Sequence, residues 1–336
     1  MGLKHVAEAA GVSEMTVSRA LRGIEGVSEQ RRKHITKVAQ NLNYFPNNNA
    51  RSLVVANSDL VGVSFPTLFN DVFADMLEGM RQTFDRSGLS TLIDTTSYGT
   101  DVELRWVERL MSWHPAAMVL TGNDHHPAVK RRLRKAGIPT LELWDVSDDP
   151  IDICVGVDHF QAGLEMGQHA LKLGYRRPGF VGIPAGRDTR ADKRRRGIEA
   201  AFAGGPDTVP MIVSTHVSPN SFQTGKMGTT ELMASQTPPD ILFFVNDHLA
   251  FGGLSACQSL GIKVPEDVGL FGFNSLDLTS VLPTPLSTMK TPRRQMGVIA
   301  AQNLISRIHG VEPERVVKLH AQIIEGKTTR QIGGDK

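Results

Sequence analysis

From Leu60 onward the sequence alternates short apolar runs with longer segments in which apolar residues recur at helical spacing, such as 73–84, 162–173 and 249–260. The apolar runs predict strands at 60–64, 89–93, 117–120, 140–143, 179–182, 211–213, 241–245 and 268–273. Short apolar strands separated by helices imply parallel sheets that are covered on both faces. Eight such units fit two doubly wound lobes better than one sheet, so we expect an α/β body.

Composition places the chain among ordinary globular proteins and excludes several other classes. With 336 residues, 40% of them hydrophobic and 21% charged, it can bury a large core without disulfides or metals. A membrane span needs about 20 consecutive apolar residues, and the longest runs here are strand-sized. The N-terminus carries no apolar signal segment, so we expect a cytoplasmic protein with no membrane partner. Cys154 and Cys257 lie far apart and are expected to be small buried side chains.

The first 57 residues form a basic head, with eight lysines and arginines against four acids, while the whole chain carries only +2. Helical spacing predicts short helices at 3–10 and 14–21, the second capped by Ser13. A third helix, capped by Ser28, is expected to bury Ile35, Val38 and Leu42. Two helices joined by a short turn with Gly11 form a helix-turn-helix, whose second helix can enter the DNA major groove. An ordinary helical hairpin remains the alternative.

Residues 44–53 link this head to the body and are predicted to form a helix only when a partner packs against them, here called a conditional helix. The segment is polar, contains Pro46 and is long enough for only one or two helical turns. So short a helix is marginal without a partner to pack against. We therefore expect this segment to switch between an ordered helix and a disordered chain. Leu53 and Val54 are apolar, which an ordinary solvent-exposed linker would not require.

Polar side chains follow several of the predicted strands, where the ligands of parallel sheets bind. They lie in 64–70 and at Thr121, Asp145, Asn246, Asp247 and Asn274, and Arg194 lies on the helix after the strand at 179–182. Amides and carboxylates can chelate adjacent hydroxyls, and a guanidinium matches a carboxylate. Phe69, Phe73 and Phe222 could supply apolar walls. Together these residues predict a sugar or sugar-acid cleft, although each taken alone could be a loop cap.

Catalytic motifs are missing from the sequence. There is no GxGxxG, HExxH or GxSxG, and the run Gly326, Lys327, Thr328 lacks the first glycine of a phosphate loop. His125 and His126 have no second ligand cluster at a recognisable spacing, so we place them in a loop at a pocket edge and expect no metal. In the basic run 193–196 we expect a solvated helix face at every position except Arg194. The sequence therefore predicts a binding protein without cofactor, not an enzyme.

Motifs in the head and the body resemble the lactose/galactose repressor family. In the head they are the segment 12–21, followed by Val27 and Ser28, and the hinge residues 44–47 and 50–53. In the body they are "GVDHFQAG" (156–163), "FVNDHLAFG" (244–252), "LGIKVPEDVGLFGFN" (260–274) and "LSTMKTPRRQMG" (286–297). The resemblance covers essentially the whole chain. Within the family, the segments 112–127, 137–145 and 152–163 are similar to gluconate-operon repressors.

The resemblance implies a domain organisation and a set of site residues. It implies a helix-turn-helix head and hinge at 1–57, and a bilobed body at 58–336 that resembles periplasmic binding proteins. Lobe 1 would span about 58–157 and 291–318, and lobe 2 about 158–290 and 319–331. The implied DNA contacts are Glu14, Met15, Thr16, Ser18, Arg19, Arg22, Asn47, Asn48, Arg51 and Leu53. The implied effector contacts are Asn70, Phe73, Thr121, Asp145, Arg194, Phe222, Asn246 and Asn274.

The resemblance also implies a mechanism: a transcriptional repressor whose affinity for double-stranded operator DNA is controlled by a sugar acid such as gluconate or 2-ketogluconate. It would act as a homodimer, with a tetramer as the larger alternative. Asn274 stands where many relatives have Asp, and a neutral amide favours an acidic ligand. The alternatives are a regulator that responds to a neutral or phosphorylated sugar, a sugar-acting α/β enzyme, and, least favoured, a solute-binding protein.

Overall fold

The computed structural model describes residues 2–21, 23–44, 58–218 and 220–332, and the chain divides into two units, Met1–Ser58 and Asp59–Lys336. We call these units the head and the body. The predicted conditional helix at 44–53 lies, except for Tyr44, outside the described residues, so it stays a prediction.

The described residues of the head contain three helices: α1 (Leu3–Ala10), α2 (Glu14–Leu21) and α3 (Glu29–Asn41). All three were predicted, and α1 and α2 begin and end at the predicted residues. The hydroxyl of Ser13 accepts a hydrogen bond from the amide of Thr16 at 3.2 Å, and the hydroxyl of Ser28 accepts one from Arg31 at 3.4 Å. Both serines therefore cap helices, as predicted.

Among the residues that the structure describes, six buried side chains make the core of the head, two from each helix: Val6, Ala7, Val17, Ala20, Ile35 and Ala39. Val38 and Leu42, predicted to be buried with Ile35, pack only partly against this core. The Arg32 guanidinium of α3 donates hydrogen bonds to the carbonyls of Ala20 and Ile24. It thereby ties the C-terminal end of α2 and the turn after it to α3.

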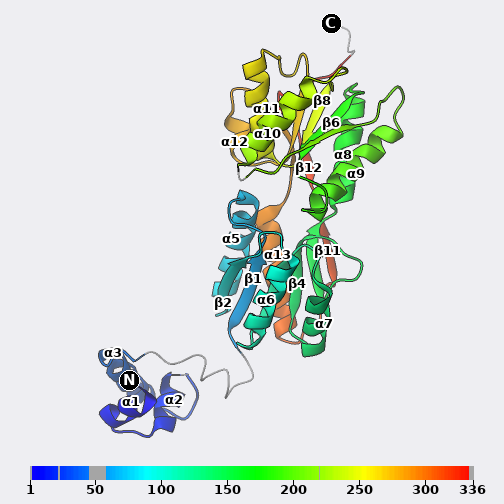
Figure 1. Cartoon of the computed structure of the whole chain (residues 1–336). Coiled ribbons are helices and arrows are strands. Elements are labelled where there is room, and N and C mark those ends of the chain that lie inside the picture. The colour runs from blue at the N-terminus through cyan, green and yellow to red at the C-terminus, as the bar shows by residue number, and fades with distance from the viewer. Residues whose placement is uncertain (1, 22, 45–57, 219, 333–336) are drawn as a thin grey trace. The chain divides into compact units, whose positions relative to one another are not determined.

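The body contains two six-stranded sheets, each with its helices, as Figure 1 shows. The first sheet and its helices, here lobe 1, has the strand order β11-β5-β4-β3-β1-β2, and all its strand pairs are parallel. Its strands are β1 (Leu60–Phe65), β2 (Ser90–Thr95), β3 (Ala117–Thr121), β4 (Thr140–Asp145), β5 (Ile153–Val157) and β11 (Val316–Leu319). Its helices are α5 (Asp71–Arg86), α6 (Thr100–Met111), α7 (Pro127–Ala136) and α13 (Arg293–Ile308).

The second sheet, here lobe 2, has the order β12-β10-β9-β8-β6-β7 and is parallel except for the pair β10 and β12. Its strands are β6 (Pro178–Gly182), β7 (Ile212–Thr215), β8 (Ile241–Phe244), β9 (Gly269–Asn274), β10 (Ser287–Lys290) and β12 (Gln322–Ile324). Its helices are α8 (His159–Lys172), α9 (Thr189–Ala203), α10 (Ser221–Met233), α11 (Asp247–Leu260) and α12 (Leu278–Val281). The predicted α/β class with a helical head and two parallel-sheet lobes is confirmed.

The prediction of eight strands was incomplete, because β5, β10, β11 and β12 were missed. β10 is polar in sequence, β11 and β12 are only four and three residues long, and β5 follows β4 without a helix between them. None of the four therefore shows the pattern of an apolar run bounded by helices.

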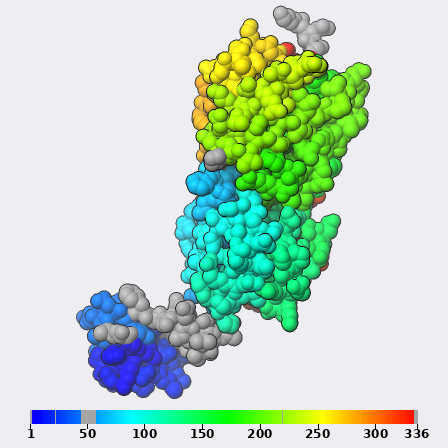
Figure 2. Space-filling model, in the orientation of Figure 1, coloured from blue at the N-terminus to red at the C-terminus, as the bar shows by residue number. Residues whose placement is uncertain are grey.

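The chain passes between the lobes after β5, after β10 and between β11 and β12. These crossings lie together, because residues of all three line two adjoining cavities that share Leu319 and His320. Lys318 and Asp158, from two of the crossings, form an ion pair of 2.7 Å. In Figure 2 the two lobes appear as distinct masses that meet along a boundary between the cyan and green surfaces.

Glycines set how closely α8 and α9 of lobe 2 approach. A Cβ on Gly163 would collide with the carbonyl of Arg194, and a Cβ on Gly197 would collide with the carbonyl of Phe160. The two backbones can touch only because neither residue has a side chain. This contact fixes the height and rotation of α9, which carries the arginines described below.

Candidate functional site

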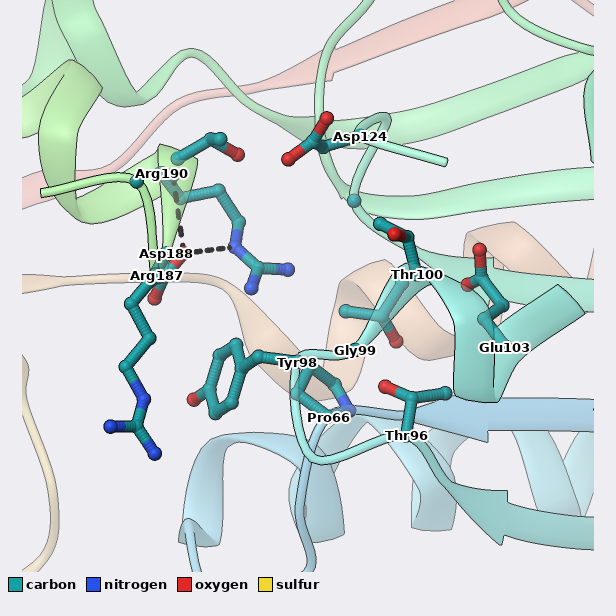
Figure 3. Close-up of a pocket in the computed structure, with 14 residues that line it drawn as sticks. Pro66, Thr96, Tyr98, Gly99, Thr100, Glu103, Asp124, Arg187, Asp188 and Arg190 are labelled. Carbon is teal, nitrogen blue, oxygen red and sulfur yellow. Dashed lines mark hydrogen bonds and ion pairs between the residues drawn. The ribbon is translucent and has the colours of Figure 1, made fainter. Parts of the chain in front are cut away.

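A cavity of about 360 Å³ opens between the lobes at the carboxyl ends of the first strands (Figure 3). Lobe 1 contributes loops that follow β1, β2 and β3, and lobe 2 contributes the loop before α9 and its first turn. The lining residues are Pro66, Thr96, Tyr98, Gly99, Thr100, Glu103, Thr121, Gly122, Asp124, Gly186, Arg187, Asp188, Thr189 and Arg190. Most are polar, so the cavity suits a ligand rich in hydroxyl or charged groups.

Arg190 provides the cationic side of the cavity. Its Nε donates a 2.7 Å hydrogen bond to Asp188, whose carboxylate also caps α9 by accepting from the Arg190 amide. Burial would raise the pKa of Asp188, but attraction to Arg190 and Arg194 outweighs it and holds the pKa below its usual value. The guanidinium carbon lies 5.9 Å from the centre of the Tyr98 ring, on the lobe 1 side. Burial raises the pKa of Tyr98 to about 12, so its hydroxyl is neutral at physiological pH.

Glu103 and Asp124 provide the acidic side, and a buried histidine supports Glu103. The Nδ1 atom of His125 lies 2.7 Å from Glu103 Oε2, and its Nε2 lies 3.3 Å from Glu142 Oε1. Burial would lower the pKa of His125, but the two carboxylates outweigh it and raise the pKa to about 9. His125 is therefore a positively charged imidazolium at neutral pH, clamped between two carboxylates.

The histidine pair was predicted to lie in a loop at a pocket edge, and the structure divides its roles. His125 is buried behind the cavity lining, whereas the ring of His126 caps α7 by accepting from the amide of Ala128. Among the described residues, no group of three or more His, Cys, Asp or Glu side chains could hold a metal ion.

Among the predicted effector residues, Thr121 lines this cavity, and its hydroxyl donates to the carbonyl of Ser64. Asp145, at the end of β4, forms an ion pair with Lys193 on α9, with 2.6 Å between Oδ2 and Nζ. This pair joins lobe 1 to lobe 2. Burial raises the pKa of Asp145, and Lys193 opposes that effect.

Arg194 lies behind the cavity lining and is engaged by the protein itself. Its guanidinium stacks on Phe273 at 4.2 Å and contacts His159 Nδ1 and the carbonyl of Val245. Because a guanidinium only donates, Nδ1 of His159 must accept, and the proton on Nε2 is donated to the carbonyl of Trp144. Burial and the neighbouring Arg194 lower the pKa of His159 well below its usual value, consistent with a neutral ring.

The remaining predicted effector residues lie at helix starts, strand ends and aromatic clusters. Asn70 and Asn246 cap α5 and α11 through their side-chain oxygens. Asn274 has a φ of 113° and a buried Oδ1 without a hydrogen-bond partner in the described part of the chain. Phe73 is buried against Phe65, and Phe222 is 45% exposed and packs on His248 and Phe251.

Two further contacts tie the lobes beside these residues. His248 of α11 lies 3.6 Å from Asp71 at the start of α5. Arg293 of α13 forms a 2.7 Å ion pair with Asp75 and donates to the carbonyl of Asn274 at the end of β9. The predicted effector residues therefore border contacts between the lobes, while most of the cavity lining was not predicted.

The missed lining residues had a signal in the sequence. Thr96, Tyr98 and Thr100 follow the second predicted strand, and Asp124 follows the third, so the rule of strand ends applied to them equally. Asp188 and Arg190 open the helix that carries Arg194. A capping pattern, Asp followed by a helical segment, marks that start.

In the head, the predicted DNA-reading residues lie on α2. Glu14, Met15 and Arg19 are exposed, Met15 by 66%, while Thr16 and Ser18 are half-buried. An exposed methionine beside an arginine on the second helix is suited to contacting base edges. The predicted contacts Arg22, Asn47, Asn48, Arg51 and Leu53 lie outside the described residues. In the described ranges, no helix has the length and apolar character to cross a membrane.

Comparisons with known proteins agree with this architecture. A family model described as "Bacterial regulatory proteins, lacI family" matches residues 2–47, and one described as "Periplasmic binding proteins and sugar binding domain of LacI family" matches residues 55–327. The HTH-type transcriptional regulator GntR of Escherichia coli strain K12 is 35% identical over 308 residues, covering 92% of each chain.

Two solved structures are also similar. A LacI family transcriptional regulator from Silicibacter pomeroyi is 34% identical, with a TM-score of 0.91 over 98% of this chain and 100% of that one. The transcription regulator GntR from Chromobacterium violaceum is 33% identical, with a TM-score of 0.74 over 80% of this chain and 99% of that one. The chain therefore belongs to the LacI family of bacterial regulatory proteins, as a DNA-binding transcription regulator and not as an enzyme.

Proposed function

We propose that the chain is a repressor whose affinity for operator DNA is controlled by a small sugar acid, such as gluconate or 2-ketogluconate, bound between the lobes. The observation that carries this proposal is the cavity, which is polar and lined from both lobes, with the Arg190 guanidinium among its walls. Hydroxyl-bearing chains suit the threonines and carboxylates, and a carboxylate suits the guanidinium. The similarity to regulators named GntR supports the same ligand class.

The effector is proposed to act by favouring one arrangement of the lobes. Asp145 and Lys193, and Asp71 and His248, contact each other across the lobes, so a ligand that shifts one lobe changes these pairs. The other predicted effector residues, including Arg194, Asn246 and Asn274, border these contacts and are proposed to respond to the ligand. A ligand shifts such an equilibrium only by its difference in affinity for the two states.

On DNA, we propose that two chains pair through their bodies so that two heads meet the two halves of a pseudo-palindromic operator. Glu14, Met15 and Arg19 would read base edges, and Thr16, Ser18 and Arg22 would contact phosphates or flanking bases. The hinge residues Asn47, Asn48 and Arg51 would lie beside the minor groove, where Leu53 would wedge between base pairs. A tetramer is the larger assembly to look for.

A titration with two arms tests the coupling. Gluconate is titrated into the protein with and without operator, and the binding affinities are compared by calorimetry. Coupling is reciprocal, so a ligand that releases operator must bind more weakly when operator is present. Equal affinities would contradict control by gluconate, and tighter binding with operator would make the ligand a corepressor.

The identity of the ligand is tested by thermal denaturation against gluconate, 2-ketogluconate, idonate, gluconate 6-phosphate and glucose. A ligand that binds only the folded state stabilises it and so raises the melting temperature. At a ligand concentration a hundredfold above Kd, the free energy of unfolding rises by about 2.7 kcal/mol. A shift with sugar acids but not with glucose supports the proposal. A shift with glucose or with the phosphate ester alone would favour a neutral-sugar or phosphosugar regulator.

The hinge role of Leu53 is tested by Leu53→Ala. We expect weaker operator binding and a smaller DNA bend, because alanine is too short to insert between the base pairs and stabilise the unstacked, kinked step. Gluconate affinity should stay unchanged. An unaltered bend angle would contradict the wedge.

A further inference from the structure

The walls of the cavity carry opposite charges on its two sides. Lobe 2 contributes Arg187, Arg190 and Asp188, whose carboxylate is already paired with Arg190 Nε, whereas lobe 1 contributes Glu103 and Asp124. Figure 3 shows the Arg190 guanidinium reaching toward the loops of lobe 1, with Asp124, Thr100 and Glu103 on the other side. A ligand that fills this space meets donors at one end and acceptors at the other.

The arginine side is built to hold an anion. The side chain of Arg190 is tied to Asp188 through Nε, and its terminal nitrogens extend into the cavity (Figure 3). One of them, Nη1, would lie 3.0 Å from a Cβ on Gly122, so a side chain there would crowd the guanidinium. A guanidinium held in this way offers the parallel donors that a carboxylate accepts.

The acidic side is built to accept hydrogen bonds, not to hold an anion. His125 contacts one oxygen of Glu103 through Nδ1 and one oxygen of Glu142 through Nε2. Lys130 Nζ lies 3.7 Å from the same oxygen of Glu142. The charge of His125 is therefore already shared by two carboxylates. Asp124 is exposed, and within the described ranges lobe 1 brings no lysine or arginine to the cavity lining. A hydroxyl can donate to Glu103 and Asp124, but a second anionic group there would meet like charges.

We propose that the cavity reads the direction of its effector: the carboxylate lies at Arg190, and the far hydroxyl end donates to Glu103 and Asp124. This inference rests on the proposed function, that a sugar acid binds here. It makes Glu103 and Asp124 specificity-determining residues that reject ligands with an anionic group at both ends. His125 is then a positioning residue, because it orients Glu103 without touching the ligand.

The test compares gluconate with glucarate, which has the same carbon chain and a second carboxylate in place of the terminal CH₂OH. Calorimetry on the full chain should show glucarate binding at least tenfold more weakly than gluconate. Whichever end of glucarate lies at Arg190, the other carboxylate must face Glu103 and Asp124.

Asp124→Asn and Glu103→Gln provide the rescue. Each removes one negative charge and keeps the size of the side chain, so each should narrow the gap between the two ligands at least threefold. Asp124 is exposed, so Asp124→Asn is expected to fold even where Glu103→Gln disturbs His125. Asp101→Asn, an exposed acid on the same α6 helix as Glu103 but outside the cavity lining, is the matched control and should leave the ratio unchanged.

The outcomes separate the two levels of the proposal. Failure of gluconate to bind would overturn the proposed function, and this inference with it. Tight gluconate binding with equal binding of glucarate, or an unchanged ratio in Asp124→Asn, would overturn the inference while the proposed function stands.

Discussion

The head and the cavity of the body place their candidate functional residues in opposite ways. In the head, the exposed residues of α2 come from one stretch of eight residues, and a core of six small side chains holds that helix. In the body, the lining comes from loops as far apart in sequence as Pro66 and Arg190, and buried charges support it. The orientation of a side chain in the head thus follows from local pattern, whereas in the cavity it depends on packing between distant segments.

The largest expected effect tests whether the head is held by its small core alone. Ile35→Ala removes the largest of the six buried side chains, which costs about 2–5 kcal/mol in a packed core. A unit of this size cannot absorb such a loss, so its unfolding transition should fall while that of the body stays in place. Calorimetric scans check this, with Lys33→Ala on the exposed face of α3 as control. A parallel fall of the body transition would show that the two units do not unfold separately.

A second prediction tests the buried charges of the body. The pKa of His125 is about 9 in the folded protein against an ordinary 6.5. Between these values the folded state holds a proton that the unfolded state has released, so this stabilisation is complete below pH 6.5 and is lost as the pH rises through 9. Urea denaturation should show a loss of roughly 2–4 kcal/mol over that range.

His125→Gln should flatten this pH dependence, because glutamine does not titrate. His309→Gln, at an exposed position after α13, should retain it. An identical pH profile for His125→Gln and the unaltered chain would refute a charged His125.

A third prediction tests whether local pattern in the head is enough to assign a reader of DNA. Arg19→Ala should cost about 1–3 kcal/mol of specific binding and relax the preference at one base pair. Arg31→Ala, an exposed arginine on α3, removes the same charge from another helix. Binding to a set of operator variants distinguishes them. Equal losses on all sequences for Arg19→Ala would make Arg19 a phosphate contact.

The smallest expected effect concerns the pair between Asp71 and His248. Asp71 is 70% exposed at its side chain, so its attraction to His248 is screened by solvent. Asp71→Asn should change the free energy of unfolding by less than about 1 kcal/mol. Asp75→Asn, which takes a carboxylate from the more buried Arg293, should cost more. Denaturation of the two variants side by side tests the order, and the reverse order would contradict it.

The fold could be predicted well where each element carries its own signal. The head helices with Ser13 and Ser28 as caps, and the eight apolar strands, all have local patterns. β10 and β12 have none, because they become strands only by pairing with each other and with β9.

The cavity was harder to predict, since strand ends identify a region but not which side chain enters it. Thr121, one of the predicted effector residues, lines the cavity. Arg194 was predicted as an effector contact, whereas Arg190, one turn earlier on the same helix, was not predicted and lines the cavity. Which arginine reaches the cavity depends on the rotation of α9, and that rotation is set by its contact with Gly163 on α8, thirty residues earlier.

The three crossings between the lobes limit how the body can move. The three segments run side by side. Twisting one lobe against the other would therefore stretch at least one of them, whereas bending the lobes toward each other moves all three together. We therefore expect the opening angle between the lobes to be the softest motion of the body. Chemically different ligands would then be distinguished by the protein only through how far each one opens or closes the lobes.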